Sequence, residues 1–109
     1  MHYIACRVSY EVTRIIPSDH PSLPGHFPDR PIVPAVVILD EVIGALAEWR
    51  PLEHVVEINS VKFLAPLEPD QPFVIQFCRR EADDSCDVVC RVGGHAIVQG
   101  RLLVQLRSS

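Results

Sequence analysis

Apolar and polar residues alternate along most of this chain, which is the pattern of β-strands that bury one face. The alternation occupies residues 4–13 and four later segments, 56–63, 73–77, 86–92 and 96–107. Within 56–63 the apolar positions change phase, which predicts a β-bulge near Asn59-Ser60. The polar segment 81–85 and the pair Gly93-Gly94 predict tight turns between the last three strands.

One segment departs from this alternation, because residues 35–49 are apolar on nearly all sides of a helix. Pro34 suits the first helical position, and Arg50 and Pro51 end the helix. We therefore expect the helix to be buried on nearly all sides. A strand, a long loop, one buried helix and four further strands predict an α+β domain spanning residues 1–109. An antiparallel sheet wrapped around one central helix is the arrangement of the hot-dog fold.

Composition narrows the classes of protein that this chain can be. With 109 residues, 48% hydrophobic, it is one folded domain rather than a disordered chain. A net charge of −4 argues against nucleic-acid binding. The sequence shows neither a signal peptide nor a run long enough to cross a membrane, so we expect a cytoplasmic protein. Four cysteines without a Cys-x-x-Cys pair are then expected to stay reduced and to bind no zinc.

The candidate catalytic residues lie in the loop before the helix and in the helix itself. Residues 17–34 hold six prolines, which stiffen the loop around His26, a side chain suited to a general base. Asp40 lies among apolar helical residues, where a carboxyl group tends to keep its proton and serves as a general acid. Free N–H groups of Ala35 and Val36 at the helix start can polarise a carbonyl group. A base, an acid and a carbonyl-binding dipole suit β-elimination beside a carbonyl.

The same residues also have simpler interpretations. A histidine in a proline-rich loop is most often solvated or structural, and an aspartate within a helix can bond a neighbouring strand or a partner chain. Glu41 and Glu48 are interpreted as a more exposed edge of the helix. From the residues alone these alternatives stay open.

A longer motif favours the catalytic interpretation. The segment Gly25-His26-Phe27-Pro28-x-x-Pro31-Ile32-x-Pro34, with an acid fourteen residues after the histidine, resembles the active-site segment of the 3-hydroxyacyl-[acyl-carrier-protein] dehydratases of the FabA/FabZ family. Downstream, Val61-Lys62-Phe63 followed by Pro66 and Pro69-Asp70 resembles a strand-turn segment of the same family.

The resemblance implies a hot-dog dimer that converts (3R)-3-hydroxyacyl thioesters to trans-2-enoyl thioesters without a metal or cofactor. It implies that each site lies between two subunits, with His26 from one and Asp40 from the other. The amide of Ala35 matches the position that binds the thioester carbonyl, and Phe27, Pro34 and Val36 are expected to line the substrate site. The expected partner is an acyl carrier protein bearing the substrate on phosphopantetheine.

Two departures from the family pattern leave further hypotheses open. The family usually has glycine at the position of Ala35 and often glutamine at that of Gly44. These differences favour a specialised member of the aryl-polyene or polyketide type, acting as a homodimer or as a partner-dependent, even non-catalytic, subunit beside a paralogue. The alternative enzyme class is a hot-dog thioesterase. Docking of an acidic carrier protein needs a local basic patch, which Arg79, Arg80, Arg91, Arg101 and Arg107 on the late strands can supply. The alternative interpretation is that these arginines belong to solvated polar faces of the strands.

Overall fold

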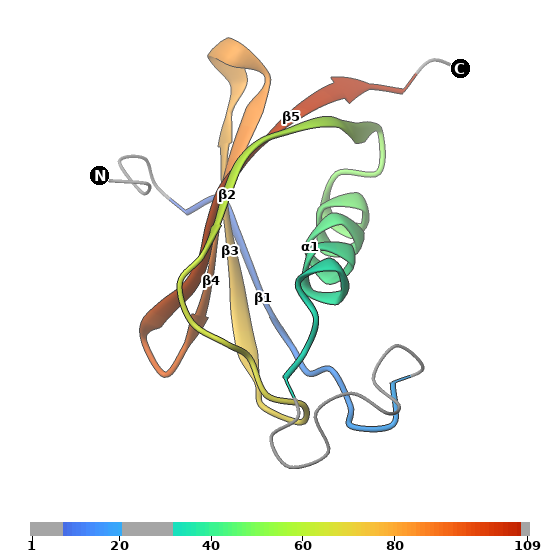
Figure 1. Cartoon of the computed structure of the whole chain (residues 1–109). Helices are drawn as coiled ribbons and strands as arrows, with labels where there is room; N and C mark the ends of the chain where they lie inside the picture. Colours follow the sequence, from blue (N-terminus) through green and yellow to red (C-terminus); the bar gives the residue numbers. More distant parts are fainter. Residues whose placement is uncertain (1–7, 21–31, 108–109) are drawn as a thin grey trace.

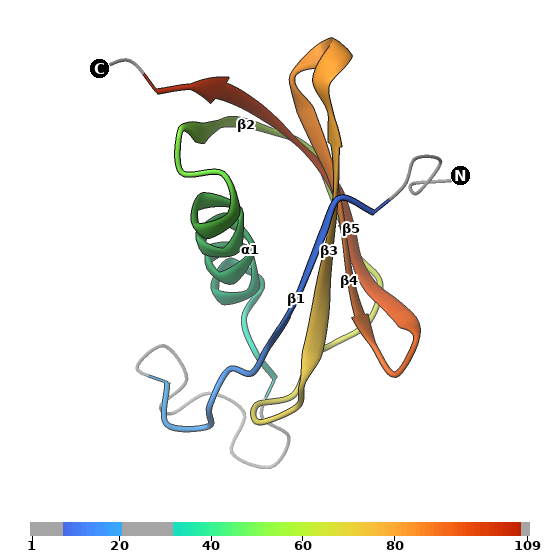
Figure 2. The same cartoon turned by 180° about the vertical axis from the view of Figure 1, so that it is seen from behind.

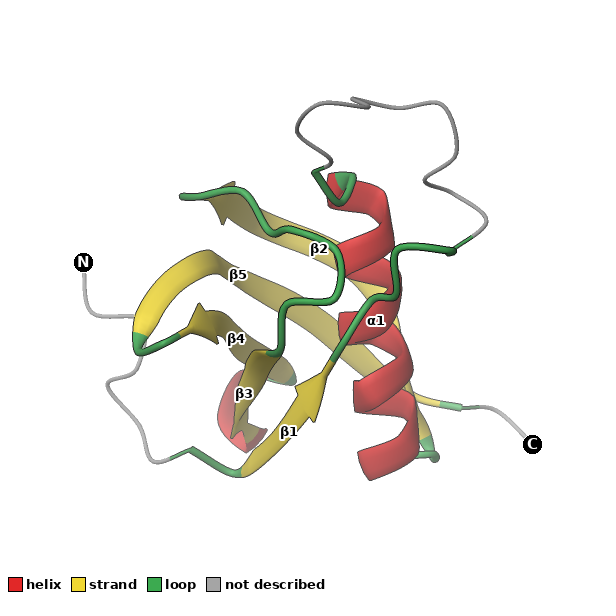
Figure 3. Ribbon diagram, turned by 90° about the horizontal axis from the view of Figure 1, so that it is seen from below, coloured by secondary structure: helices red, strands yellow, loops and turns green. Residues whose placement is uncertain are grey.

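A computed structural model of the chain describes residues 8–20 and 32–107. In this part the elements follow the order β1 (Tyr10–Arg14), α1 (Ala35–Trp49), β2 (Glu53–Phe63), β3 (Phe73–Arg80), the short 3₁₀ turn η1 (Glu81–Asp83), β4 (Ser85–Val92) and β5 (His95–Leu106). The strands form a curved sheet, and α1 lies along its concave side (Figures 1 and 3). The predicted α+β class and the wrapped helix are confirmed.

The sheet is antiparallel throughout, with the strand order β1-β3-β4-β5-β2. β2 therefore pairs with the last strand and lies at one edge, while β1 lies at the other (Figure 2). Register shifts interrupt the pairing of β2 with β5 between Val55 and Glu57 and between Ile58 and Ser60. The second shift confirms the predicted bulge, and the first adds another that the alternation did not reveal.

The chain turns and bends where the sequence provides glycine. Gly93 and Gly94 both have positive φ, 56° and 86°, and close the two-residue hairpin between β4 and β5. Gly100 in β5 lies opposite Val61 beside the second bulge, where an added Cβ atom would stand 2.8 Å from the carbonyl oxygen of Ser60. The close approach of β2 and β5 at this point requires glycine.

Helix α1 buries only the side that faces the sheet. Its buried residues are Val37, Ile38, Val42, Ala45 and Leu46. The expectation of burial on nearly all sides is wrong for the single chain, because the sheet curves around one side of the helix only. Another side exposes Val36, Asp40, Gly44 and Glu48, spaced four residues apart. Pro34 is the N-cap rather than the first helical residue.

The cysteines divide into two kinds. Cys86 and Cys90 are free thiols in the core, and burial raises the pKa of each to about 12. Cys78 is disulfide-bonded to a partner outside the described residues. The expectation that all four stay reduced is therefore wrong for Cys78, since motif spacing does not reveal which sulfur atoms the fold brings together. Within residues 8–20 and 32–107, no helix is long and apolar enough to cross a membrane.

Candidate active site

The start of α1 presents two unused backbone donors. Pro34 provides no side-chain cap, and its carbonyl oxygen accepts from the amides of Val37 at 3.0 Å and Ile38 at 3.3 Å. The amides of Ala35 and Val36 have no partner among the described residues, and both residues are exposed. The helix dipole adds partial positive charge at this end, so the two amides are able to bind a polarised carbonyl oxygen.

An apolar hollow of about 300 Å³ adjoins these amides. We call it the α1 N-terminal pocket. It lies between the start of the helix and the chain at the end of β2. Its lining residues are Ile32, Val33, Ala35, Ile38 and Phe63–Leu67. The predicted carbonyl-binding residue Ala35 therefore lies at the wall of a cavity suited to an apolar chain.

His26 and Phe27 lie outside the described residues, but the chain on both sides of them is fixed to one turn. The amide of Asp70 donates to the carbonyl oxygen of Ile16 at 2.8 Å, and the amide of Ser18 donates to the Asp70 carboxylate at 3.0 Å. On the other side, the amide of Val33 donates to the carbonyl oxygen of Leu67 at 2.8 Å. Leu67 and Asp70 of the downstream motif thus bind the described chain on either side of residues 21–31.

Asp40 lies on the exposed side of α1, not against its own sheet. At 100° per residue, Ile43 and Ala47 lie within about 60° of Asp40 around the helix axis. These two residues are half-buried, and both line a second cavity. The carboxyl group therefore stands beside an apolar surface, but the described chain leaves it open to solvent.

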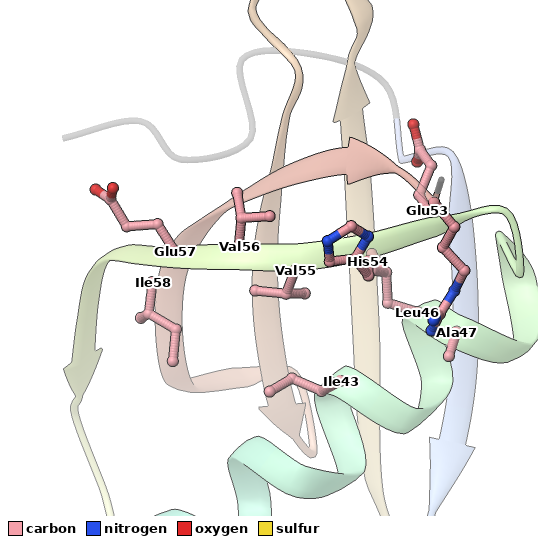
Figure 4. Close-up of a pocket in the computed structure, with 10 residues that line it drawn as sticks. Ile43, Leu46, Ala47, Glu53, His54, Val55, Val56, Glu57 and Ile58 are labelled. Atoms are coloured by element: carbon pink, nitrogen blue, oxygen red, sulfur yellow. The ribbon is translucent and has the colours of Figure 1, made fainter. Parts of the chain in front are cut away.

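That second cavity, the α1–β2 groove, has a volume of about 470 Å³. Its apolar lining comes from the second half of the helix and the first half of the edge strand, and consists of Ile43, Leu46, Ala47, Val55, Val56 and Ile58. Figure 4 shows Ile43 directed from the helix toward Val55 and Ile58 of β2. Glu53, His54, Glu57 and Arg107 add polar atoms to the lining.

The end of the groove is held by a buried ion-pair cluster. Arg79 of β3 contacts Glu53 with Nη2 at 2.6 Å and Nε at 3.2 Å, and both side chains are about 5% exposed. Arg50, at the C-terminus of α1, also binds Glu53. The hydrogen bond from Arg79 outweighs burial and lowers the pKa of Glu53 to about 2. This cluster joins the helix, the edge strand and β3, and no pattern in the sequence indicated that Glu53 would be buried.

The arginines of the late strands form ion pairs and hydrogen bonds within the chain. Arg79 is engaged by Glu53, and Arg101 binds the buried Asp87 with Nε at 2.7 Å. These two are internal partners rather than free charges for docking a carrier protein. The remaining three also contact acceptors within the chain: Arg80 pairs with Asp83 and Asp87, Arg91 binds Gln76, and Arg107 binds the carbonyl of Pro51.

Comparison with known proteins adds a family and a fold. The model of the ApeI-like family, described as ApeI dehydratase, matches residues 5–101. The 3-hydroxyacyl-[acyl-carrier-protein] dehydratase FabZ of Bordetella pertussis is 23% identical over 103 residues, which cover 82% of this chain and 66% of FabZ. FabZ of Rhizorhabdus wittichii is 31% identical over 91 residues, which cover 74% of this chain and 56% of that FabZ. The chain thus spans just under two thirds of the length of the first relative and less of the second.

Among solved structures, the dehydratase heterocomplex ApeI:P from Xenorhabdus doucetiae has a TM-score of 0.79 at 20% identity, covering 95% of this chain and 92% of that one. A mutant of the fluoroacetyl-CoA-specific thioesterase FlK gives 0.61 at 15% identity, with 89% of both chains covered. At these identities the likeness establishes the hot-dog fold, which dehydratases and thioesterases share.

Proposed function

We propose that this chain, which belongs to the ApeI-like dehydratase family, removes water from (3R)-3-hydroxyacyl thioesters and forms trans-2-enoyl thioesters. The observation that carries the proposal is the start of α1, the helix that bears Asp40. There two amides without a partner in the described part of the chain adjoin an apolar pocket. The substrate is proposed to arrive on the phosphopantetheine of an acyl carrier protein in the cytoplasm, and no metal or cofactor takes part.

Each group has one role in the proposed reaction. The amides of Ala35 and Val36 bind the thioester oxygen, which acidifies the neighbouring carbon. His26 takes the proton from that carbon, and the electron pair forms the double bond as the bond to the 3-hydroxyl group breaks. Asp40 gives its proton to the departing oxygen, which leaves as water. The proton held by His26 then returns to the carboxylate through water, and the site is restored.

A second subunit is proposed to complete the site. Asp40, Val36 and Gly44 are exposed on one side of α1, and an added Cβ atom at Gly44 meets nothing within 4 Å. The edge strand β2 exposes Val56 and Ile58, each by 44%. A twin or a paralogue packed on these surfaces would exclude water from Asp40, which the general acid requires. It would also let His26 of one subunit meet Asp40 of the other.

The first experiment assays the purified chain with 3-hydroxyacyl chains bound to carrier protein, with products identified by mass. We expect the loss of water, and a drop of about 10²–10⁴-fold in kcat for His26→Ala and for Asp40→Asn. Glu41→Gln, next to Asp40 on another side of the helix, is the matched control and should retain activity. Release of a free acid and a thiol would instead establish a thioesterase. Near-normal turnover in both variants would refute the assigned roles.

A mixing experiment tests the shared site. We expect chains with His26→Ala or Asp40→Asn to be inactive alone. In an equal mixture with random pairing, half of the dimers combine the two variants and have one intact site of two, which should restore about a quarter of the normal rate. No recovery, with exchange of subunits demonstrated, would place both groups in one chain. If the wild-type chain gains activity only with a paralogue, it is the partner-dependent subunit that Ala35 and Gly44 favour.

A further inference from the structure

The turn between β2 and β3 holds the chain on both sides of residues 21–31. On the side that precedes them, the carboxylate of Asp70 accepts a hydrogen bond from the amide of Ser18 at 3.0 Å. On the side that follows them, the carbonyl oxygen of Leu67 accepts from the amide of Val33 at 2.8 Å. One short turn therefore fixes two points of the chain that are far apart in the sequence.

Asp70 stands in this turn at a backbone conformation that suits glycine best. Its φ is 65°, a left-handed value that glycine adopts freely and that aspartate tolerates better than most other residues. Glycine would therefore form the same turn, and the turn alone does not account for an aspartate. The carboxylate adds the hydrogen bond to Ser18, which spans 52 residues of sequence.

The turn is a firm support for that hydrogen bond, because it is tied to the core. Leu67 is 1% exposed and lines the α1 N-terminal pocket. The amide of Asp70 donates to the carbonyl oxygen of Ile16, which is also 1% exposed. The side chain of Gln71 accepts from the amide of Glu68 at 3.2 Å and closes the turn. Movement of this turn would displace both the pocket wall and the core.

We propose that Asp70 is a positioning residue that sets where the chain bearing His26 starts relative to the start of α1. His26 stands midway between Ser18 and Val33 in the sequence, so the turn holds the chain on both sides of it. This inference rests on the proposed dehydratase function, in which His26 removes a proton from a thioester bound at Ala35. A displacement of about 1 Å in a reacting group can lower a rate by about a hundredfold.

The two held points have different consequences for the reaction. Val33 precedes the N-cap Pro34, so its hydrogen bond to Leu67 fixes the helix start that would bind the thioester. The hydrogen bond between Ser18 and Asp70 is distant in sequence from those amides and fixes the other end of the segment. Loss of the Asp70 carboxylate is therefore expected to disturb the base and to spare substrate binding.

The first test removes the carboxylate and keeps the backbone conformation. Asp70→Gly suits φ of 65°, and we expect its kcat to fall roughly 10–100-fold while KM changes by less than about threefold. Asp70→Asn retains an acceptor oxygen and tolerates the same φ, so its kcat should stay within about threefold of the wild-type value.

Asp84→Gly is the matched control. Asp84 also has a positive φ, 52°, and its carboxylate also accepts a hydrogen bond, from Arg79 at 3.3 Å. It lies in the turn that follows β3, whereas Asp70 lies in the turn that precedes β3, so the two turns are at opposite ends of that strand (Figure 1). This variant should keep the wild-type kcat and KM.

A purely structural role of Asp70 predicts other results. If Asp70→Gly lowers the urea midpoint but the folded protein keeps its kcat, the inference is overturned. A raised KM with an unchanged kcat also overturns it, because Asp70 would then act on binding. An equal loss of kcat in Asp70→Asn and Asp70→Gly overturns it as well, since the asparagine retains the acceptor.

Nuclear magnetic resonance of the histidine rings separates this inference from the proposed function. The ring signal of His26 is identified by its absence from His26→Ala, and we expect it to shift in Asp70→Gly but not in Asp84→Gly. Such a shift in a chain that dehydrates no substrate supports the positioning of His26 and refutes only the proposed reaction. An unchanged His26 signal in folded Asp70→Gly overturns the inference, whatever the activity.

Discussion

Replacing Glu53 by glutamine should change how the stability of this protein depends on pH. Glu53 is 5% exposed and is bound by Arg79 and Arg50, so its negative charge is held between two guanidinium groups. In Glu53→Gln that charge is lost, and the remaining charged partners of Arg79 among residues 8–20 and 32–107 are the exposed Glu81 and Asp84. A buried pair that loses one member is strongly destabilised.

The size of the effect follows from the pKa of Glu53. The hydrogen bond from Arg79 is the largest cause that lowers this pKa from its ordinary 4.5 to about 2. At about 1.4 kcal/mol for each pKa unit, the charged form stabilises the folded state by about 3 kcal/mol. Because the folded pKa is below the unfolded one, this stabilisation is complete above about pH 5 and is lost as the pH falls toward 2.

The assay is urea unfolding followed by the fluorescence of Trp49, the single tryptophan, which stacks on Tyr10 at 5.1 Å. Protein concentration is fixed, since self-association would otherwise shift the midpoint. We expect the wild-type chain to lose about 3 kcal/mol more than Glu53→Gln between pH 6 and pH 2.5. Glu57→Gln, at an exposed position of the same strand, is the control and should follow the wild-type curve. If the free energy of unfolding fell equally with pH in the wild type and in Glu53→Gln, the reasoning would be refuted.

Two further predictions concern the sheet. Gly100→Ala places a methyl group 2.8 Å from the carbonyl oxygen of Ser60 and should lower the free energy of unfolding by about 1–3 kcal/mol, measured by the same urea assay; an unchanged midpoint would contradict the close approach of β2 and β5. Asp87→Asn removes the buried charge that Arg101 binds at 2.7 Å and should cost about 2 kcal/mol, whereas Asp83→Asn at an exposed position should cost much less. Equal costs would refute a special role for the buried pair.

The sequence predicted the features that local chemistry decides. Apolar periodicity located the helix at 35–49, the phase change located the bulge at Ile58–Ser60, and paired glycines located the last hairpin. Features that depend on strand order were missed. Glu53 is buried because β3 brings Arg79 to it from 26 residues away, and His54 lines a groove because β2 lies beside the helix. His26 lies outside the described residues, so its place in the site stays a prediction.

The distribution of apolar surface on α1 favours a second subunit in the proposed chemistry. A carboxyl group that donates a proton near neutral pH needs a dry environment, yet the sheet-facing side of the helix is filled by the core and Asp40 is on another side. Turning Asp40 toward the sheet would displace core residues such as Val42 and Leu46, both at most 1% exposed. In the proposed mechanism a second subunit provides this cover, so assembly and acid catalysis would depend on the same side of one helix.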